Sequence, residues 1–187
     1  MSVKNNVANI LAELTDNLKV LNEVQLEALV GAILRADHIF TAGMGRSGVS
    51  IRAFTNRLMH LGFAVSSIGE ITVPHSHPGD LVIIASGSGE TDSLAALARK
   101  AKNSGVSLAL ITMDAESTIA RLADVVVVLP GVSPKLKNKG LEITSIQPMG
   151  SAFEQMVYLA CDGIVLELME RTGQTSEEMF ERHADFE

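Results

Sequence analysis

Two short segments of the sequence concentrate glycine and hydroxyl groups, the residue types that bind phosphate. Residues 43–48 read Gly-Met-Gly-Arg-Ser-Gly, and residues 86–91 read Ser-Gly-Ser-Gly-Glu-Thr. Glycine lets the backbone approach a ligand closely, and the N–H groups at a helix start bind anions. Together the segments predict a site for a phosphorylated ligand. The candidate phosphate- and sugar-binding residues are Gly45, Arg46, Ser47, Ser86, Gly87, Ser88 and Thr91.

Each segment also has a less specific interpretation. Both could be ordinary tight turns in which a serine caps the following helix. Residues 43–48 also match G-x-G-x-x-G, and Glu70 lies where a dinucleotide fold places its acidic residue. The second segment favours the phosphate site, because a dinucleotide fold does not require it. No G-x-x-x-x-G-K-[ST] motif occurs, which excludes a P-loop. Glu90 adds an acid beside the predicted phosphate, so we expect its side chain to point away.

A repeating order of strands and helices positions both segments. Short apolar strands are predicted at 38–42, 63–67, 80–86, 106–112 and 124–129. Helices are predicted within 7–34 (two, broken near Asn22) and at 47–61, 90–102, 117–122, 150–171 and 176–182. Apolar strands that alternate with helices indicate a parallel sheet covered on both faces. We therefore predict an α/β fold, a three-layer α/β/α sandwich with a five-stranded parallel sheet in flavodoxin-like order. Both segments then follow strand ends, where such sheets bind ligands.

The chain length of 187 residues predicts one domain, 1–187. Within it we expect N-terminal helices at 1–36, the core sheet at 37–130, a loop at 131–148 and C-terminal helices at 149–187.

Composition excludes several classes of function. The net charge is −7 and no basic run occurs, which argues against a nucleic-acid partner. The N-terminus lacks the order of a signal peptide, and the apolar runs are too short to span a membrane, so we expect a cytoplasmic protein. Cys161 is the single cysteine and is expected in the core. His75 and His77 lack a third ligand nearby, so we predict no metal site.

Further segments extend the match to a known family. Residues 43–48 and 86–91 resemble the sugar isomerase (SIS) domain family. Residues 57–62, 147–155 and 179–187 resemble the 6-phospho-3-hexuloisomerases within it. The resemblance implies interconversion of D-arabino-hex-3-ulose 6-phosphate and D-fructose 6-phosphate without a cofactor. It also implies a homo-oligomer, a dimer or a tetramer that associates through helices, and a place in formaldehyde fixation by the ribulose monophosphate pathway.

The implied reaction requires a base at carbon and a proton shuttle between two oxygens. Moving a carbonyl from C3 to C2 proceeds most simply through a 2,3-enediol, without a metal or a hydride carrier. By spacing alone, Glu154 is the last residue of a capping box with Ser151, and His183 is a surface residue near the terminus. The resemblance makes Glu154 the carbon base. It makes His183 the oxygen-proton shuttle or the ring-opening group, in its own chain or in a neighbouring subunit's site, whereas His60 is expected to be packed.

Two other functions remain open from the sequence. The chain could be a different sugar-phosphate isomerase, an aldose–ketose enzyme whose enediol spans C1 and C2. It could also be a non-catalytic SIS module that senses a sugar phosphate. Such modules usually accompany a DNA-binding domain, for which we expect no room here because the N-terminal helices lead directly into the first strand. A sensor requires the phosphate segments but not Glu154.

Overall fold

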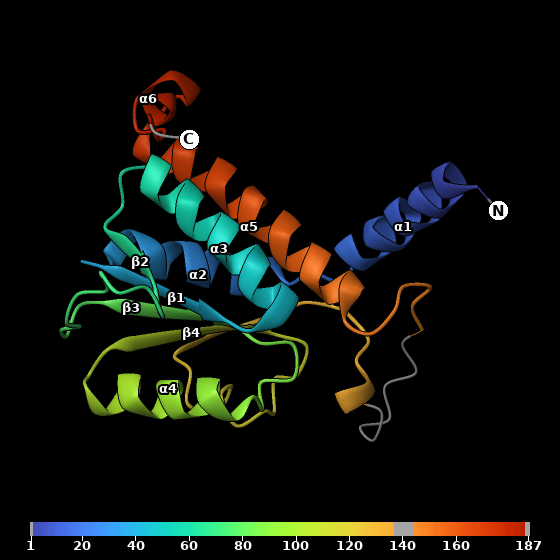
Figure 1. Cartoon of the computed structure of the whole chain (residues 1–187), viewed down its shortest axis with the longest axis horizontal. Helices are drawn as coiled ribbons and strands as arrows, with labels where there is room; N and C mark the ends of the chain where they lie inside the picture. The colour runs from blue at the N-terminus through green and yellow to red at the C-terminus, as the bar shows by residue number, and fades with distance from the viewer. Residues whose placement is uncertain (1, 137–143, 186–187) are drawn as a thin grey trace.

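The computed structural model describes residues 2–136 and 144–185, and its centre is a five-stranded sheet (Figure 1). The strands are β1 (Ile39–Gly43), β2 (Val65–Ser67), β3 (Leu81–Ala85), β4 (Ser107–Thr112) and β5 (Val125–Val128). They pair in the order β2-β1-β3-β4-β5, and every pair is parallel. This is the flavodoxin-like order. The predicted fold class is confirmed.

Helices cover both faces of the sheet. They are α1 (Val3–Leu18), α2 (Glu23–Arg35), α3 (Gly45–His60), α4 (Asp92–Asn103), α5 (Ser151–Thr172) and α6 (Ser176–Phe180), with a 3-10 turn at Pro134–Leu136. Figure 1 shows α4 on one face and α2, α3 and α5 on the other. The sandwich therefore has three layers, with a single long helix in the outer layer on the α4 side.

The central strands supply side chains to two separate cores. Leu81 and Ile83 of β3 enter the core beneath α2, α3 and α5, whereas Val82 and Ile84 enter the core beneath α4. Successive side chains of a strand point to opposite faces, so a strand buried on both faces is apolar at every position. This explains the continuous apolar run in the sequence.

One predicted element is wrong. Residues 117–122 form a series of turns, not a helix. The Ile119 N–H donates to the carbonyl of Gly89 at 3.2 Å, and the Ala120 N–H donates to Ser117 Oγ at 3.3 Å. The apolar spacing that suggested a helix instead places Ile119 and Ala120 in the core beneath α4. The segment is held by the loop that follows β3.

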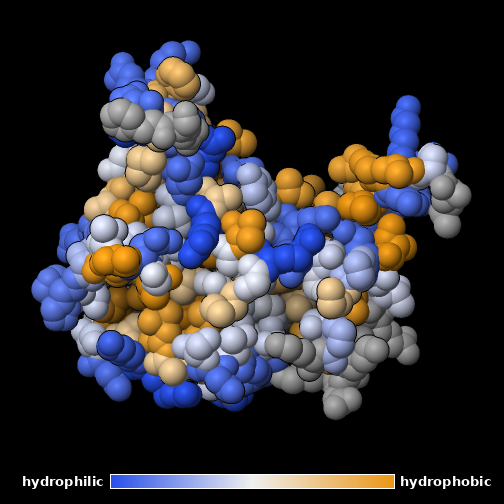
Figure 2. All heavy atoms as spheres, viewed as in Figure 1, coloured by the Kyte–Doolittle hydropathy of each residue, from blue (hydrophilic) through white to orange (hydrophobic). Residues whose placement is uncertain are grey.

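Helix α1 extends away from the sheet and leaves apolar surface uncovered (Figures 1 and 2). Its exposed apolar side chains are Val3, Val7, Leu11 and Leu18. A groove of about 450 Å³ separates α1 and α2 from α5, and Leu14, Leu26 and Leu159 are among its lining residues. None of the described helices is long and apolar enough to cross a membrane.

Candidate functional site

A cavity of about 320 Å³ lies at the carboxyl edge of the sheet. It sits between the segments that follow β1 and β3, the point where the strand order reverses direction and where open α/β sheets bind ligands. Its lining residues are Met44, Gly45, Ser47, Ala85, Ser86, Gly87, Ser88, Thr91, Leu94, Met113, Ser133, Gly150, Phe153 and Glu154. Seven of the nine residues predicted from the sequence therefore line one cavity; the exceptions are Arg46 and His183.

The segment after β1 brings the start of α3 to the cavity through close backbone packing. Gly43 and Gly48 touch, since a Cβ on Gly48 would lie 2.6 Å from the Gly43 oxygen. Gly45 has φ +57° with open space around it. Such a turn requires glycine at the contact and favours it at the positive φ. As a result, the first turn of α3, with its unpaired N–H groups, borders the cavity at Ser47.

Hydrogen bonds from the end of β4 hold the segment after β3 in place. The Met113 N–H donates to the Gly87 carbonyl at 3.0 Å, and Thr112 Oγ1 donates to the same oxygen at 3.2 Å. Within the described residues, no acceptor takes the backbone N–H of Gly87 or Ser88. A rigid loop with unused donors that line a cavity can bind an anion.

The capping alternative for these segments is wrong. The residues at the two N-cap positions are Met44 for α3 and Thr91 for α4, and neither makes a side-chain capping bond. The hydroxyl of Thr91 therefore does not cap its own helix, and Thr91 lines the cavity. Glu90 is oriented as expected, because its Oε1 accepts the Thr118 N–H at 2.7 Å and the residue does not line the cavity.

Glu154 lies on the cavity wall in the first turn of α5. Its Oε2 accepts a hydrogen bond from Arg46 Nε at 2.5 Å, and 18% of its side chain is exposed. The capping box with Ser151 does not form, because Gly150 is the N-cap residue and no side chain caps α5. Arg46, predicted to contact phosphate or sugar, is instead paired with the carboxylate predicted to be the base.

His183 lies at the opposite end of α5 from Glu154. Its ring stacks on His60 with centroids 5.4 Å apart and on Phe180 at 5.7 Å. Helix α5 has 22 residues, so it spans about 33 Å at 1.5 Å per residue. His183 therefore does not reach the cavity of its own chain. His60 is buried, as expected.

Other residues considered in the sequence lie outside the cavity. The rings of His75 and His77 stack at 5.1 Å, and no group of three metal-ligating side chains occurs within the described residues. Cys161 is buried in the core, and burial raises the pKa of its thiol. An inert core cysteine is what its sequence position predicted. Of the predicted loop 131–148, residues 137–143 lie outside the described residues.

Seven lining residues were not predicted from the sequence. Two of them are apolar core residues, Ala85 at the end of β3 and Leu94 in α4. Met44 lies inside the first segment, and Gly150 and Phe153 flank Glu154 on α5. Met113 and Ser133 follow the ends of β4 and β5. A rule that admits every residue just beyond a strand's carboxyl end would have found the last two.

Known proteins match the chain along most of its length. A model of the SIS domain family matches residues 32–159. The 3-hexulose-6-phosphate isomerase of Bacillus subtilis (strain 168) is 46% identical over 181 residues, covering 97% of both chains. The 3-hexulose-6-phosphate isomerase of Mycobacterium gastri is 35% identical over 185 residues, covering 99% of this chain and 92% of that one.

A solved structure also resembles the chain over nearly its whole length. A hypothetical protein from Methanococcus jannaschii, whose structure led to an inferred function of 3-hexulose-6-phosphate isomerase, aligns with a TM-score of 0.80 and 32% identity. The alignment covers 97% of this chain and 96% of that one. The site at the carboxyl edge, the family model and the near-full-length relatives agree: the chain belongs to the SIS domain family.

Proposed function

We propose that the chain catalyses the interconversion of D-arabino-hex-3-ulose 6-phosphate and D-fructose 6-phosphate. The observation that carries this proposal is the position of Glu154, a carboxylate on the wall of the same cavity that the two glycine- and hydroxyl-rich segments line. A protein that only binds sugar phosphate needs those segments but no base. The near-full-length relatives named 3-hexulose-6-phosphate isomerase support the same activity.

The phosphate group is held by donors without formal charge. The donors are the N–H groups of Gly87 and Ser88 and the hydroxyls of Ser47, Ser86, Ser88 and Thr91, all from residues that line the cavity, and they supply hydrogen bonds to the phosphate oxygens. The starts of α3 and α4 add their positive dipole ends. Since the net charge of the chain is −7, attraction of an anionic substrate comes from this local arrangement.

The carbon chemistry is a proton transfer on one face of the sugar. Glu154 removes the proton from C2 of the 3-ketose, the electron pair forms the C2–C3 double bond, and the C3 oxygen receives a proton to give the 2,3-enediol. The enediol then loses the proton of its C2 hydroxyl, and C3 takes back the proton held by Glu154. The product is the 2-ketose. No electron leaves the substrate, so the reaction needs no redox cofactor.

The second proton transfer, between the C2 and C3 oxygens, is assigned to His183 of a neighbouring subunit. The exposed imidazole lies at the far end of α5 from its own cavity. An imidazole is suited to proton transfer near neutral pH. This assignment makes the active unit a homo-oligomer in which His183 of one copy approaches Glu154 of another.

The apolar surface of α1 supports association between copies. Its exposed stripe and the adjoining groove against α5 leave large aliphatic side chains in water, among them Leu11 and Leu159. Contiguous exposed apolar surface of this kind marks interaction sites. We expect light scattering at micromolar concentration to give a dimer or a tetramer. A stable monomer would remove both the association and the assignment of His183. The cytoplasmic location and the pathway in formaldehyde fixation stay predictions.

Proton NMR of fructose 6-phosphate in deuterated water tests the function directly. Deuterium at C3, with formation of the 3-ketose phosphate, is the expected result because the 2,3-enediol exchanges that position. Exchange at C1 would instead assign the chain to the aldose–ketose isomerases. Binding of fructose 6-phosphate without any exchange would favour the sugar-phosphate sensor. The Glu154→Gln variant is the matched control, since it keeps the cavity and removes the base.

A further inference from the structure

We propose that Arg46 is a positioning residue for Glu154, one that holds the Oε2 atom of the carboxylate and leaves Oε1 to accept the substrate proton. This inference rests on the proposed function and assigns Arg46 a task beyond substrate binding. It concerns two residues that are 108 positions apart in the chain and meet where two helices begin.

The contact between the two side chains is short and directional. Arg46 Nε donates to Glu154 Oε2 at 2.5 Å, so one oxygen of the carboxylate is fixed by a charged donor. Both residues lie in first turns, Arg46 in α3 and Glu154 in α5, and the two helices run side by side in the same direction (Figure 1).

The backbone beneath the carboxylate is fixed by the same pair of helices. Ser50, one turn after Arg46 on α3, donates from Oγ to the carbonyl oxygen of Glu154 at 2.9 Å. The main chain of Glu154 is therefore tied to α3 by Ser50 and its side chain is tied to α3 by Arg46. A base held at two points has little freedom to leave the reactive geometry.

The second carboxylate oxygen lies beside Gly150, another residue that lines the cavity. A Cβ built on Gly150 would lie 3.8 Å from Glu154 Oε1, and both residues line the cavity. Because Gly150 has no side chain, nothing from that position covers Oε1. The two oxygens thus have different surroundings: Oε2 is held by Arg46, and Oε1 lies near Gly150 without a charged partner among the described residues.

The side-on geometry also leaves donors on Arg46. Only Nε contacts Glu154, and within the described residues no acceptor takes a hydrogen bond from Nη1 or Nη2. The Arg46 side chain is 63% exposed, so these nitrogens are accessible to a substrate oxygen. Arg46 can therefore hold the base with one nitrogen and contact a sugar hydroxyl with the others.

The structure offers a matched control on the same helix. Arg52 of α3 is 62% exposed, against 63% for Arg46, and it pairs with Glu70 at 3.4 Å, a residue outside the cavity. Arg52→Gln removes the same charge from the same helix without touching Glu154. Its kinetic constants should match those of the wild type. This separates positioning from the general effect of losing an exposed arginine.

The test is a comparison of kcat and KM for fructose 6-phosphate in Arg46→Gln, Arg46→Lys and Arg52→Gln. A misplaced catalytic group costs on the order of 10²-fold, so we expect Arg46→Gln to lower kcat by about that factor, with a smaller change in KM. Lysine cannot reproduce the side-on Nε contact and should recover only part of the loss. Added guanidinium should partly restore kcat of Arg46→Gln and leave Arg52→Gln unchanged.

The outcomes distinguish this inference from the proposed function. If the wild type fails to convert fructose 6-phosphate, the proposed function is wrong. If the wild type is active and Arg46→Gln keeps kcat within twofold or raises only KM, positioning is wrong and the function stands. An equal fall in kcat in Arg52→Gln would likewise overturn the specific role of Arg46. Equal melting temperatures of the variants and the wild type show that the comparison is between folded proteins.

Discussion

The two ends of α5 have very different surroundings. At its start, Glu154 is mostly buried in the wall of the cavity, together with the start of α3 and residues of the segments 43–48 and 86–91. At its end, Gly173 closes the helix in a left-handed conformation, and the short helix α6 presents His183 on the surface. The start is built from glycine contacts and cavity-facing donors, whereas the end is built from exposed side chains around one arginine.

That arginine, Arg182, connects three elements at the far end. Its Nη1 donates to the His60 carbonyl at the end of α3, to Gln174 Oε1 and to the Glu178 carbonyl of α6. His183 is the next residue along the chain, so its place on the surface is defined. The predicted base and the predicted proton shuttle therefore lie at different ends of α5. A common site for them needs two chains.

The largest effect is expected from Glu154→Gln, which removes the base at the start of α5. Turnover of fructose 6-phosphate should fall by about 10³-fold or more, because a general base contributes roughly 10²–10⁴-fold and the amide cannot replace it. Binding of fructose 6-phosphate, measured by calorimetry, should change little since the phosphate donors remain. Glu170→Gln, an exposed change near the far end of the same helix, is the control. Turnover within tenfold of the wild type would remove Glu154 from the mechanism.

The next largest effect is expected from His183→Ala, which tests whether His183 of one chain acts in the cavity of a neighbouring chain. His183→Ala alone should lower kcat by about 10²-fold. Mixing it with Glu154→Gln under conditions that exchange subunits should restore activity, because a mixed dimer contains one site with both native residues. Statistical mixing of dimers gives about a quarter of the wild-type activity. No recovery in proven mixed oligomers would contradict the assignment between subunits.

The sequence predicts the fold more completely than it predicts the site. The strands of this sheet are short apolar runs separated by helical periods, and their parallel order follows from the alternation. The prediction of a helix at 117–122 fails because its apolar residues are spaced as in a helix, while the N–H groups of Thr118 and Ile119 donate to Glu90 and Gly89 in the loop after β3. Periodicity reports which side chains are buried and cannot report which backbone groups pair.

The parts of the site missed by the sequence depend on contacts over long chain separations. The segments after β1 and β3 could be recognised because each carries its glycines and hydroxyls together. The contact between Arg46 and Glu154 joins residues 108 positions apart. The sequence pattern around Glu154 instead indicated a local contact, the capping box with Ser151, which does not form. The separation of His183 from its own cavity follows from the length of α5, once the helix is placed with its start at the cavity.

A moderate effect is expected from Gly89→Ala at the start of α4. Gly89 has φ +61°, and a Cβ there would collide with the hydroxyl of Ser117. The loop must shift, so KM for fructose 6-phosphate should rise about tenfold, with a smaller change in kcat since Glu154 is untouched. Gly31→Ala on α2 meets only the flexible Arg35 side chain and is the control. An unchanged KM would show that this loop does not hold the phosphate.

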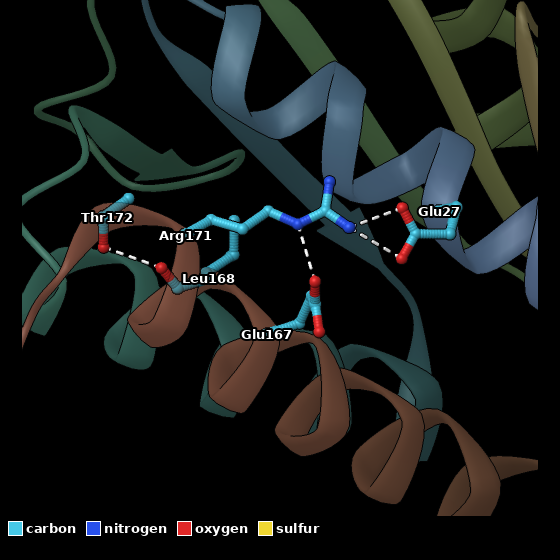
Figure 3. Close-up of polar contacts among 5 residues, drawn as sticks. All are labelled: Glu27, Glu167, Leu168, Arg171 and Thr172. Atoms are coloured by element: carbon cyan, nitrogen blue, oxygen red, sulfur yellow. Dashed lines mark hydrogen bonds and ion pairs between the residues drawn. The ribbon is translucent and has the colours of Figure 1, made fainter.

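The smallest effect is expected from Arg171→Met, near the end of α5 (Figure 3). Arg171 Nη2 donates to both Glu27 oxygens on α2, at 2.8 and 2.6 Å, and its Nε donates to Glu167 at 2.6 Å. Hydrogen bonds to Glu27 and then to Glu167 raise the pKa of Arg171. With a raised pKa on Arg171, this contribution to stability is present at neutral pH and is lost on the alkaline side only as pH rises through that value.

Salt, rather than alkaline pH, is therefore the practical way to weaken this bridge between α5 and α2. An exposed ion pair contributes little to the free energy of unfolding, so calorimetry should show a slightly lower melting temperature for Arg171→Met than for the wild type. The difference between the two melting temperatures should become smaller in about 1 M salt, which screens the ion pair. The kcat should equal that of the wild type, because Arg182 and not Arg171 holds α6 in place. A clear fall in kcat would contradict this division of tasks. It would mean that the packing of α5 on α2 also determines how the far end of one chain meets the cavity of another.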